Sequence, residues 1–197
     1  MDGDGRADAI VINNDRQVYV KKSNGVGFGS TVVWLTNIPN DRESKNYFYD
    51  VTGPDADGKR RADLIAVNNN GLVVCKATQS DGFAACTNWT ANNLFTGARG
   101  TYFADYNGDG RVDAIKIETT GTGPRFDVIV GYSTGSSFLS DNRQASNFQS
   151  DRGIYFAKLD ATNRDYLVTV MENGVWILNS NTGNYYNATN GPFYGLR

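Results

Sequence analysis

The sequence repeats itself with a period of about fifty residues. The heptapeptide Arg-Gly-Thr-Tyr-Phe-Ala-Asp at 99–105 returns at 152–158 as Arg-Gly-Ile-Tyr-Phe-Ala-Lys. A looser copy, Asn-Tyr-Phe-Tyr-Asp, occupies 46–50. Because each copy must bury its apolar face against a neighbour, repeats of this length predict a stacked array.

A second motif recurs in step with the first. Ala-Asp-Ala-Ile-Val-Ile-Asn at 7–13 returns at 62–68 and 112–118, and in a degraded form at 164–170. We call the aspartate of each copy its marker aspartate; these are Asp8, Asp63, Asp113 and Asp165. They lie 55, 50 and 52 residues apart, a spacing typical of propeller blades and related β-arrays.

The local signals within each repeat favour strands. Apolar and polar residues alternate at 17–21 and 114–117, and turns rich in Asn and Gly follow the apolar runs. We therefore predict an all-β fold of propeller blades, each with about four antiparallel strands. The whole chain is predicted to be one propeller-type domain of four repeats, at about 1–45, 46–98, 99–151 and 152–197.

The first repeat lacks the Tyr-Phe strand with which the others open. This favours a segment of a larger propeller, because an incomplete blade exposes an unpaired edge. Alternatively, the C-terminal 193–194 segment folds back to fill the gap, or two chains form a homodimer edge to edge.

The third repeat contains an oxygen-rich loop at 105–113. Its nine positions place carboxylate or amide oxygens at 1, 3, 5 and 9, and a backbone carbonyl at 7. Calcium prefers six to eight such oxygens, and glycines allow the tight turn. An EF-hand is excluded because its twelfth position, here Lys116, requires glutamate. The predicted Ca²⁺ ligands are Asp105, Asn107, Asp109, the carbonyl of Arg111, and Asp113.

The other loops are partial copies. The second retains Asp55, Asp57 and Asp63, but its fifth position is Lys59, whose ammonium could occupy the place of a cation. Asp50 is a possible substitute ligand there. The first loop has Asp2, Asp4 and Asp8 at positions 3, 5 and 9. In the fourth, Lys158 and Thr162 replace ligands, so we expect no metal.

The pattern Tyr-Phe-Ala-Asp-x-Asn-Gly-Asp-Gly-x-x-Asp-Ala-Ile, followed by a hairpin and a Gly-x-Phe turn, resembles the FG-GAP/VCBS repeat. That family includes the calcium-binding blades of integrin α-chain propellers. The resemblance covers nearly the whole chain and implies a seven- or eight-bladed propeller. It also implies calcium binding by the third loop, through the five residues predicted above.

Two cysteines, Cys75 and Cys86, flank a predicted hairpin tip. They could face each other across two strands and form a disulfide, which would indicate an extracellular, secreted or cell-surface protein. The alternative is two free buried thiols.

Several function classes are disfavoured by what the sequence lacks. It contains no histidine, which excludes His-based catalysis and His-ligated zinc, and we do not expect an enzyme. A net charge of −2 argues against nucleic acid. No apolar run approaches the roughly 18 residues of a membrane helix, so we expect no membrane insertion.

Three aromatic residues are candidates for ligand binding. Trp34 and Trp89 occupy equivalent places in the first two repeats, and Tyr186 lies near that place in the fourth. They could stack on sugars between blades, or the tryptophans could pack as repeat core. We expect a calcium-stabilised extracellular module that binds a glycan or a protein. The alternative is a non-binding structural spacer beside a secreted enzyme.

Overall fold

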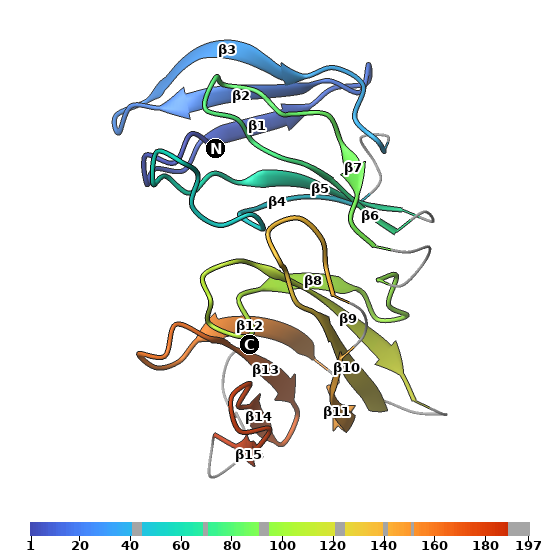
Figure 1. Cartoon of the computed structure of the whole chain (residues 1–197). Coiled ribbons are helices and arrows are strands. Elements are labelled where there is room, and N and C mark those ends of the chain that lie inside the picture. Colours follow the sequence, from blue (N-terminus) through green and yellow to red (C-terminus); the bar gives the residue numbers. More distant parts are fainter. Residues whose placement is uncertain are drawn as a thin grey trace. The chain divides into compact units, whose positions relative to one another are not determined.

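A computed structural model describes residues 1–40, 45–68, 71–90, 95–120, 125–139, 142–150 and 152–188. Within these ranges the chain forms β-strands and no helix (Figure 1). The strands build four separate sheets, and within each sheet consecutive strands pair antiparallel. The all-β prediction is therefore confirmed.

Each sheet is a short meander. The first contains β1 (Ala9–Ile12), β2 (Val18–Ser23) and β3 (Phe28–Leu35). The second contains β4 (Asn46–Tyr49), β5 (Asp63–Asn68), β6 (Gly71–Cys75) and β7 (Thr87–Asn88). The third contains β8 (Thr101–Ala104), β9 (Asp113–Thr119), β10 (Arg125–Gly131) and β11 (Asn142–Gln149). The fourth contains β12 (Gly153–Lys158), β13 (Asp165–Met171), β14 (Gly174–Leu178) and β15 (Tyr185–Asn187).

The four sheets lie within the four predicted repeats. The Tyr-Phe motif forms the opening strand of the second, third and fourth sheets, namely β4, β8 and β12. Among the described residues, the first sheet has no counterpart of that strand, so β1 pairs only with β2. The 193–194 segment, expected as one way to fill the gap, lies outside the described residues.

The chain divides into two compact units. The first unit comprises Met1–Thr96 and Ser133–Phe138, and it contains the first two sheets. The second comprises Gly97–Tyr132 and Leu139–Arg197, and it contains the third and fourth sheets. The Ser133–Phe138 segment is a turn of the third repeat, so the unit boundary does not follow the repeat boundary.

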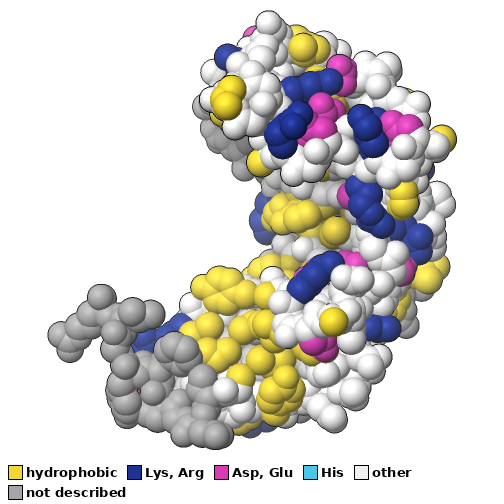
Figure 2. Space-filling model, turned by 90° about the vertical axis from the view of Figure 1, so that its left-hand side faces the viewer, with side chains coloured by type: hydrophobic (Ala, Val, Ile, Leu, Met, Phe, Trp, Pro, Cys, Tyr) yellow, Lys and Arg dark blue, Asp and Glu magenta, His cyan; other side chains and the backbone are white. Residues whose placement is uncertain are grey.

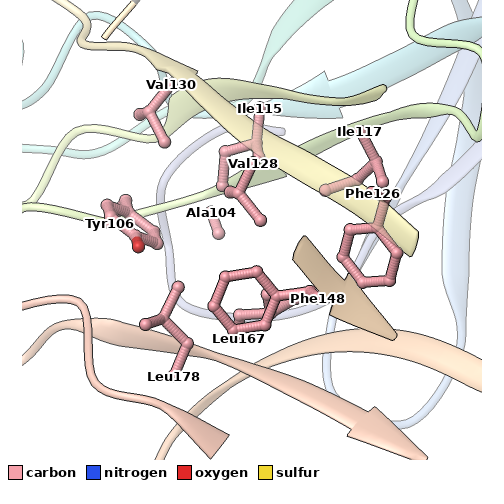
Figure 3. Packing of buried hydrophobic residues seen from close by; sticks show 10 residues of the cluster. All are labelled: Ala104, Tyr106, Ile115, Ile117, Phe126, Val128, Val130, Phe148, Leu167 and Leu178. Atoms are coloured by element: carbon pink, nitrogen blue, oxygen red, sulfur yellow. The ribbon is translucent and has the colours of Figure 1, made fainter. Parts of the chain in front are cut away.

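The core of the second unit lies between its two sheets (Figure 3). Alternate residues of β9 and β10 point to one side, and register places Ile115 opposite Val130 and Ile117 opposite Val128. Leu167 and Leu178 of the fourth sheet approach from the other side. Burying each such side chain contributes roughly 1.5–3 kcal/mol.

The first unit has a core of the same kind. It contains Val18, Val20 and Trp34 of the first sheet together with Leu64 and Cys75 of the second. Period-two alternation supplies these side chains from one face of each strand. Both cores position the loops that lead into β1, β5, β9 and β13; Asp63, Asp113 and Asp165 begin the last three of these strands, and Asp8 immediately precedes β1.

Candidate functional site

The third aspartate loop connects β8 to β9. Gly108 and Gly110 have φ angles of 76° and 86°, a region that favours glycine. Their N–H groups donate to the two oxygens of the Asp105 carboxylate, at 2.8 and 2.9 Å. Burial raises the pKa of Asp105 above its ordinary value, although the N–H groups of Gly110 and Gly108 act in the opposite direction. The loop therefore folds around its first carboxylate.

The carboxylates of the marker aspartates accept hydrogen bonds from backbone N–H groups. Asp113 is fully buried, and its Oδ2 accepts from the N–H groups of Tyr106 and Asn107, at 3.0 and 3.3 Å. Asp63 accepts in the same way from Val51 at 3.1 Å, and its other oxygen accepts from the Ala77 N–H at 2.8 Å. Burial raises the pKa of Asp63 to about 6. Asp63 and Asp113 therefore connect their loops to the sheet through buried carboxyl groups.

The fifth position of the third loop has a basic partner. Arg111 Nη2 lies 2.5 Å from Asp109 Oδ2, and the Asn107 amide donates to the same oxygen at 3.1 Å. The Asp109 and Arg111 side chains are about one-third exposed, at 29% and 32%. The arrangement brings the predicted ligands into one turn while Arg111 contacts one of their carboxylates.

The second loop contains a more complete ion pair. Arg61 Nη1 lies 2.6 Å from Asp55 Oδ2 and donates to Asp57 Oδ1 at 2.9 Å. Its Nη2 lies 2.6 Å from Asp57 Oδ2. The Arg61 guanidinium holds the pKa of Asp57 well below its ordinary value. The expectation that Lys59 occupies the place of a cation is wrong, because Arg61 holds both carboxylates.

The proposed substitute ligand Asp50 is also engaged. Arg60 Nη1 lies 2.8 Å from Asp50 Oδ2, and the Gly53 N–H donates to its Oδ1 at 2.7 Å. Asp50 therefore forms a second ion pair, with Arg60, the residue immediately before Arg61.

In the first loop, too, the carboxylates contact basic side chains and backbone N–H groups. Arg6 Nη2 lies 2.5 Å from Asp4 Oδ2, and Lys22 Nζ lies 3.5 Å from Asp2 Oδ2. Asp8 accepts from the Ser23 N–H at 2.8 Å. All three predicted ligands of this loop thus contact basic side chains or backbone N–H groups.

The fourth loop is connected to the third. Asp165 Oδ2 accepts from the Asp105 N–H at 2.7 Å, and the Asp165 N–H donates to the Asp105 carbonyl at 2.8 Å. Asp160 accepts hydrogen bonds from the hydroxyls of Thr162 and Tyr166. The marker of the fourth repeat therefore holds the loop of the repeat before it.

Metal binding requires these ligands to converge. In the described residues, no group of three or more Asp, Glu, His or Cys side chains is close enough to hold a metal ion. In the second loop the guanidinium already lies between Asp55 and Asp57, so that loop does not fit calcium as it stands. The third loop has the complete set of oxygen donors, and Arg111 competes with an ion for Asp109.

The two candidate tryptophans lie in the core, which corrects their assignment as candidate ligand-binding residues. Trp34 and Trp89 are 3% and 4% exposed. Trp34 packs edge-on against Phe83 at 5.5 Å, and Trp89 packs against Phe138 at 5.3 Å. Each ring contacts the Gly-x-Phe or equivalent turn of the next repeat, so neither is available for stacking on a sugar.

The fourth sheet carries two exposed tyrosines on one face. Tyr186 is 45% exposed and Tyr155 is 56% exposed. Register places Tyr155 opposite Val168, Val168 opposite Ile177, and Ile177 opposite Tyr186. Directly paired residues point to the same face of a sheet, so these four side chains form one row. We call this row the tyrosine row.

Sequence analysis did not identify Tyr155 as a candidate. Its motif matches that of Tyr102, whose ring packs against Phe156 in the second unit. The signal that separates the two tyrosines is their neighbours. β9, which pairs with the Tyr102 strand, is buried along most of its length, whereas β13 is only partly buried.

Cys75 and Cys86 are joined by a disulfide, with their Cα atoms 4.0 Å apart. Cys75 ends β6, and Cys86 immediately precedes β7. The bond therefore connects the two ends of the hairpin tip within the first unit.

The described residues form no helix with the length and hydropathy that a membrane span needs.

No protein-family model and no curated protein matches the sequence. Among solved structures, the fold resembles a lectin from Agrocybe aegerita, whose structure concerns specific recognition of non-reducing terminal N-acetylglucosamine. The TM-score is 0.70 at 20% identity, over 94% of this chain and 50% of the lectin chain. The fold also resembles part of the Tc holotoxin pore of Photorhabdus luminescens, with a TM-score of 0.55 at 18% identity, over 91% of this chain and 9% of that chain. The chain thus spans about half the length of the lectin, with which it shares a fold.

Proposed function

We propose that this chain is a carbohydrate-binding module. The observation that carries the proposal is the likeness of its fold to that of the Agrocybe aegerita lectin, which extends over 94% of the chain. The absence of histidine from the sequence agrees with a binding role rather than catalysis. The ligand class we propose is a glycan, with a protein ligand as the other possible outcome.

The tyrosine row is the surface that suits this role. Tyrosine presents a flat apolar ring and a polar hydroxyl, which match the apolar face and hydroxyls of a sugar. Tyr155 and Tyr186 are three strand spacings apart, about 14 Å. That separation is too large for one sugar ring, so the row favours an oligosaccharide. Figure 2 shows exposed hydrophobic side chains over the second unit, in the lower half of the view.

A glycan array tests the proposal. We expect Tyr155→Ala and Tyr186→Ala each to weaken binding about tenfold, since loss of an interface aromatic costs more than 1 kcal/mol. Tyr49→Ala is the matched control, because Tyr49 is an exposed tyrosine of the first unit, at 39%. The proposal fails if no glycan is retained, or if all three variants bind as the parent does.

Calcium binding by the third loop is the second part of the proposal. Asp105, Asn107, Asp109, the Arg111 carbonyl and Asp113 would hold the ion, which supplies positive charge at the centre of the turn. For Asp109 to bind the ion, it must exchange its contact with the Arg111 guanidinium. Because metal that binds only the folded state stabilises it, calcium would strengthen the second unit.

A secreted or cell-surface location completes the proposal. The Cys75–Cys86 disulfide supports it, because such bonds persist in oxidising compartments. A second candidate function is a non-binding structural array beside another domain. The likeness to 9% of a toxin component favours it, since there the fold is a small part of a large chain.

A further inference from the structure

The three aspartate loops share a basic residue that calcium ligation does not require. Arg6, Arg61 and Arg111 each stand two residues before the marker aspartate of their repeat. This is position seven, where a calcium loop supplies only a backbone carbonyl. In each loop the guanidinium turns back onto a carboxylate of the same loop. Figure 2 shows Lys and Arg side chains beside Asp and Glu side chains over the first unit.

The three arginines differ in how completely they are enclosed. The Arg61 side chain is 6% exposed, whereas those of Arg111 and Arg6 are 32% and 50% exposed. Arg61 bridges the carboxylates at positions one and three, and the other two contact the carboxylate at position five. The bridging guanidinium therefore belongs to the second loop alone among these three.

Charge explains why such a bridge replaces an ion. Asp55 and Asp57 repel each other unless a cation lies between them. A guanidinium has a fixed positive charge and five N–H donors in a planar fork, so it can hold two carboxylates at once. Arg61 uses one oxygen of Asp55 and both oxygens of Asp57, which are the atoms that calcium would need.

We propose that Arg61 is the built-in cation of the second loop, which therefore folds without calcium. The loop keeps the acidic residues of a metal site, but the arginine takes the place of the metal. Removing the guanidinium would then convert the loop into a calcium-dependent one. The inference rests on the proposed function only in assigning calcium to the third loop instead.

Thermal melts of Arg61→Ala in excess chelator and in millimolar calcium test the inference. In chelator we expect the melting temperature to fall by roughly 2–4 °C, because two carboxylates that are 27% and 34% exposed lose the guanidinium that lies between them. Calcium should restore at least half of that loss, and titration should find one more bound ion per chain than in the parent. Arg60→Ala is the matched control, because the Arg60 side chain is 47% exposed and contacts Asp50 instead. It should lower the melting temperature less than Arg61→Ala does, and it should add no bound ion.

Two outcomes would overturn the inference. One is an Arg61→Ala variant as stable in chelator as Arg60→Ala. The other is a destabilised variant that calcium does not rescue, since Arg61 would then be a packing residue. If Arg61→Ala folds in neither medium, Arg61→Lys decides, because lysine lacks the planar fork with which Arg61 holds three carboxylate oxygens at once. Calcium must stabilise that variant more than it stabilises the parent.

The same melts keep this inference separate from the proposed function. A parent chain that binds no calcium contradicts the third-loop assignment. Calcium rescue of Arg61→Ala would still support the role of Arg61. Conversely, a parent that binds one ion, with an Arg61→Ala variant that gains none, contradicts only the inference.

Discussion

Glycine at the fourth position of the aspartate loops meets two separate demands. Gly58 and Gly108 have φ angles of 75° and 76°, which a residue with a Cβ adopts only under strain. At Gly108 a Cβ would also lie 2.7 Å from Arg164 Cγ and 3.1 Å from the Thr162 carbonyl oxygen. At Gly58 the same space is open. The third loop thus approaches the fourth closely, and glycine makes that approach possible.

Comparing Gly108→Ala with Gly58→Ala separates these demands. Backbone strain alone should cost about 1 kcal/mol in Gly58→Ala. Gly108→Ala should cost about 1–3 kcal/mol more, because the carbonyl of Thr162 cannot move as a side-chain end does. Chemical denaturation measures both values. Equal losses would show that the approach between the third and fourth loops adds nothing.

At the scale of single residues, the sequence predicts which oxygen ligands a loop offers better than it predicts which cation they contact. The spacing of Asp105, Asp109 and Asp113 indicates one turn, because alternate positions of a tight loop face the same side. It does not indicate which cation they meet. Lys59 and Arg61 both lie in the second loop, and their side chains differ in length and in the number of N–H donors. Only the folded loop shows that Arg61 lies between Asp55 and Asp57.

Consecutive repeats are in contact through an aromatic pair. In each pair, a tryptophan at or just after the last strand of one repeat packs on a phenylalanine from a turn of the next repeat. Trp34 of β3 packs on Phe83, and its carbonyl accepts from the Phe83 N–H at 3.1 Å. Trp89, just beyond β7, repeats both contacts with Phe138, at 5.3 Å between rings and 3.2 Å between N and O. A turn from one repeat is thereby held against the strand of the repeat before it.

Phe138→Ala tests this contact within the first unit. Phe138 is 6% exposed, so its truncation should destabilise the protein by about 3–5 kcal/mol. Phe138→Leu keeps most of the volume and should cost less than about 1.5 kcal/mol. Urea denaturation followed by tryptophan fluorescence measures both, with Trp89 as a nearby reporter. Similar small losses in the two variants would contradict a packing role for the ring.

Alternation predicts which residues share a face but not which face is covered. The pattern at 114–117 correctly indicated a strand of the third sheet, now β9. It could not separate buried Trp34 from exposed Tyr155, because burial depends on the neighbouring sheet and turn. The self-similarity of the sequence supplied the repeat length and the positions of the aspartate loops. The aromatic contacts between repeats come from tertiary structure alone.

At the scale of the whole molecule, the two units have different covalent and ionic constraints. The Cys75–Cys86 disulfide lies in the first unit. The third loop, which we propose binds calcium, lies in the second unit. Treatments that remove one constraint should therefore act first on one unit. Amide hydrogen exchange can measure the two units separately, because it reports local opening segment by segment.

We expect reduction to speed amide exchange in β5 and β6 about a hundredfold, while β9 and β10 change little. Closing a loop of this size contributes about 3 kcal/mol, and each 1.4 kcal/mol is a factor of ten.

Chelator should instead speed exchange in β8 and β9, by a similar factor if calcium was present at about a hundred times its dissociation constant. Asp109→Ala should exchange alike with and without calcium. Two titratable thiols before reduction would contradict the disulfide. Chelator effects confined to β5 and β6 would place the metal in the second loop, against both the third-loop assignment and the role of Arg61.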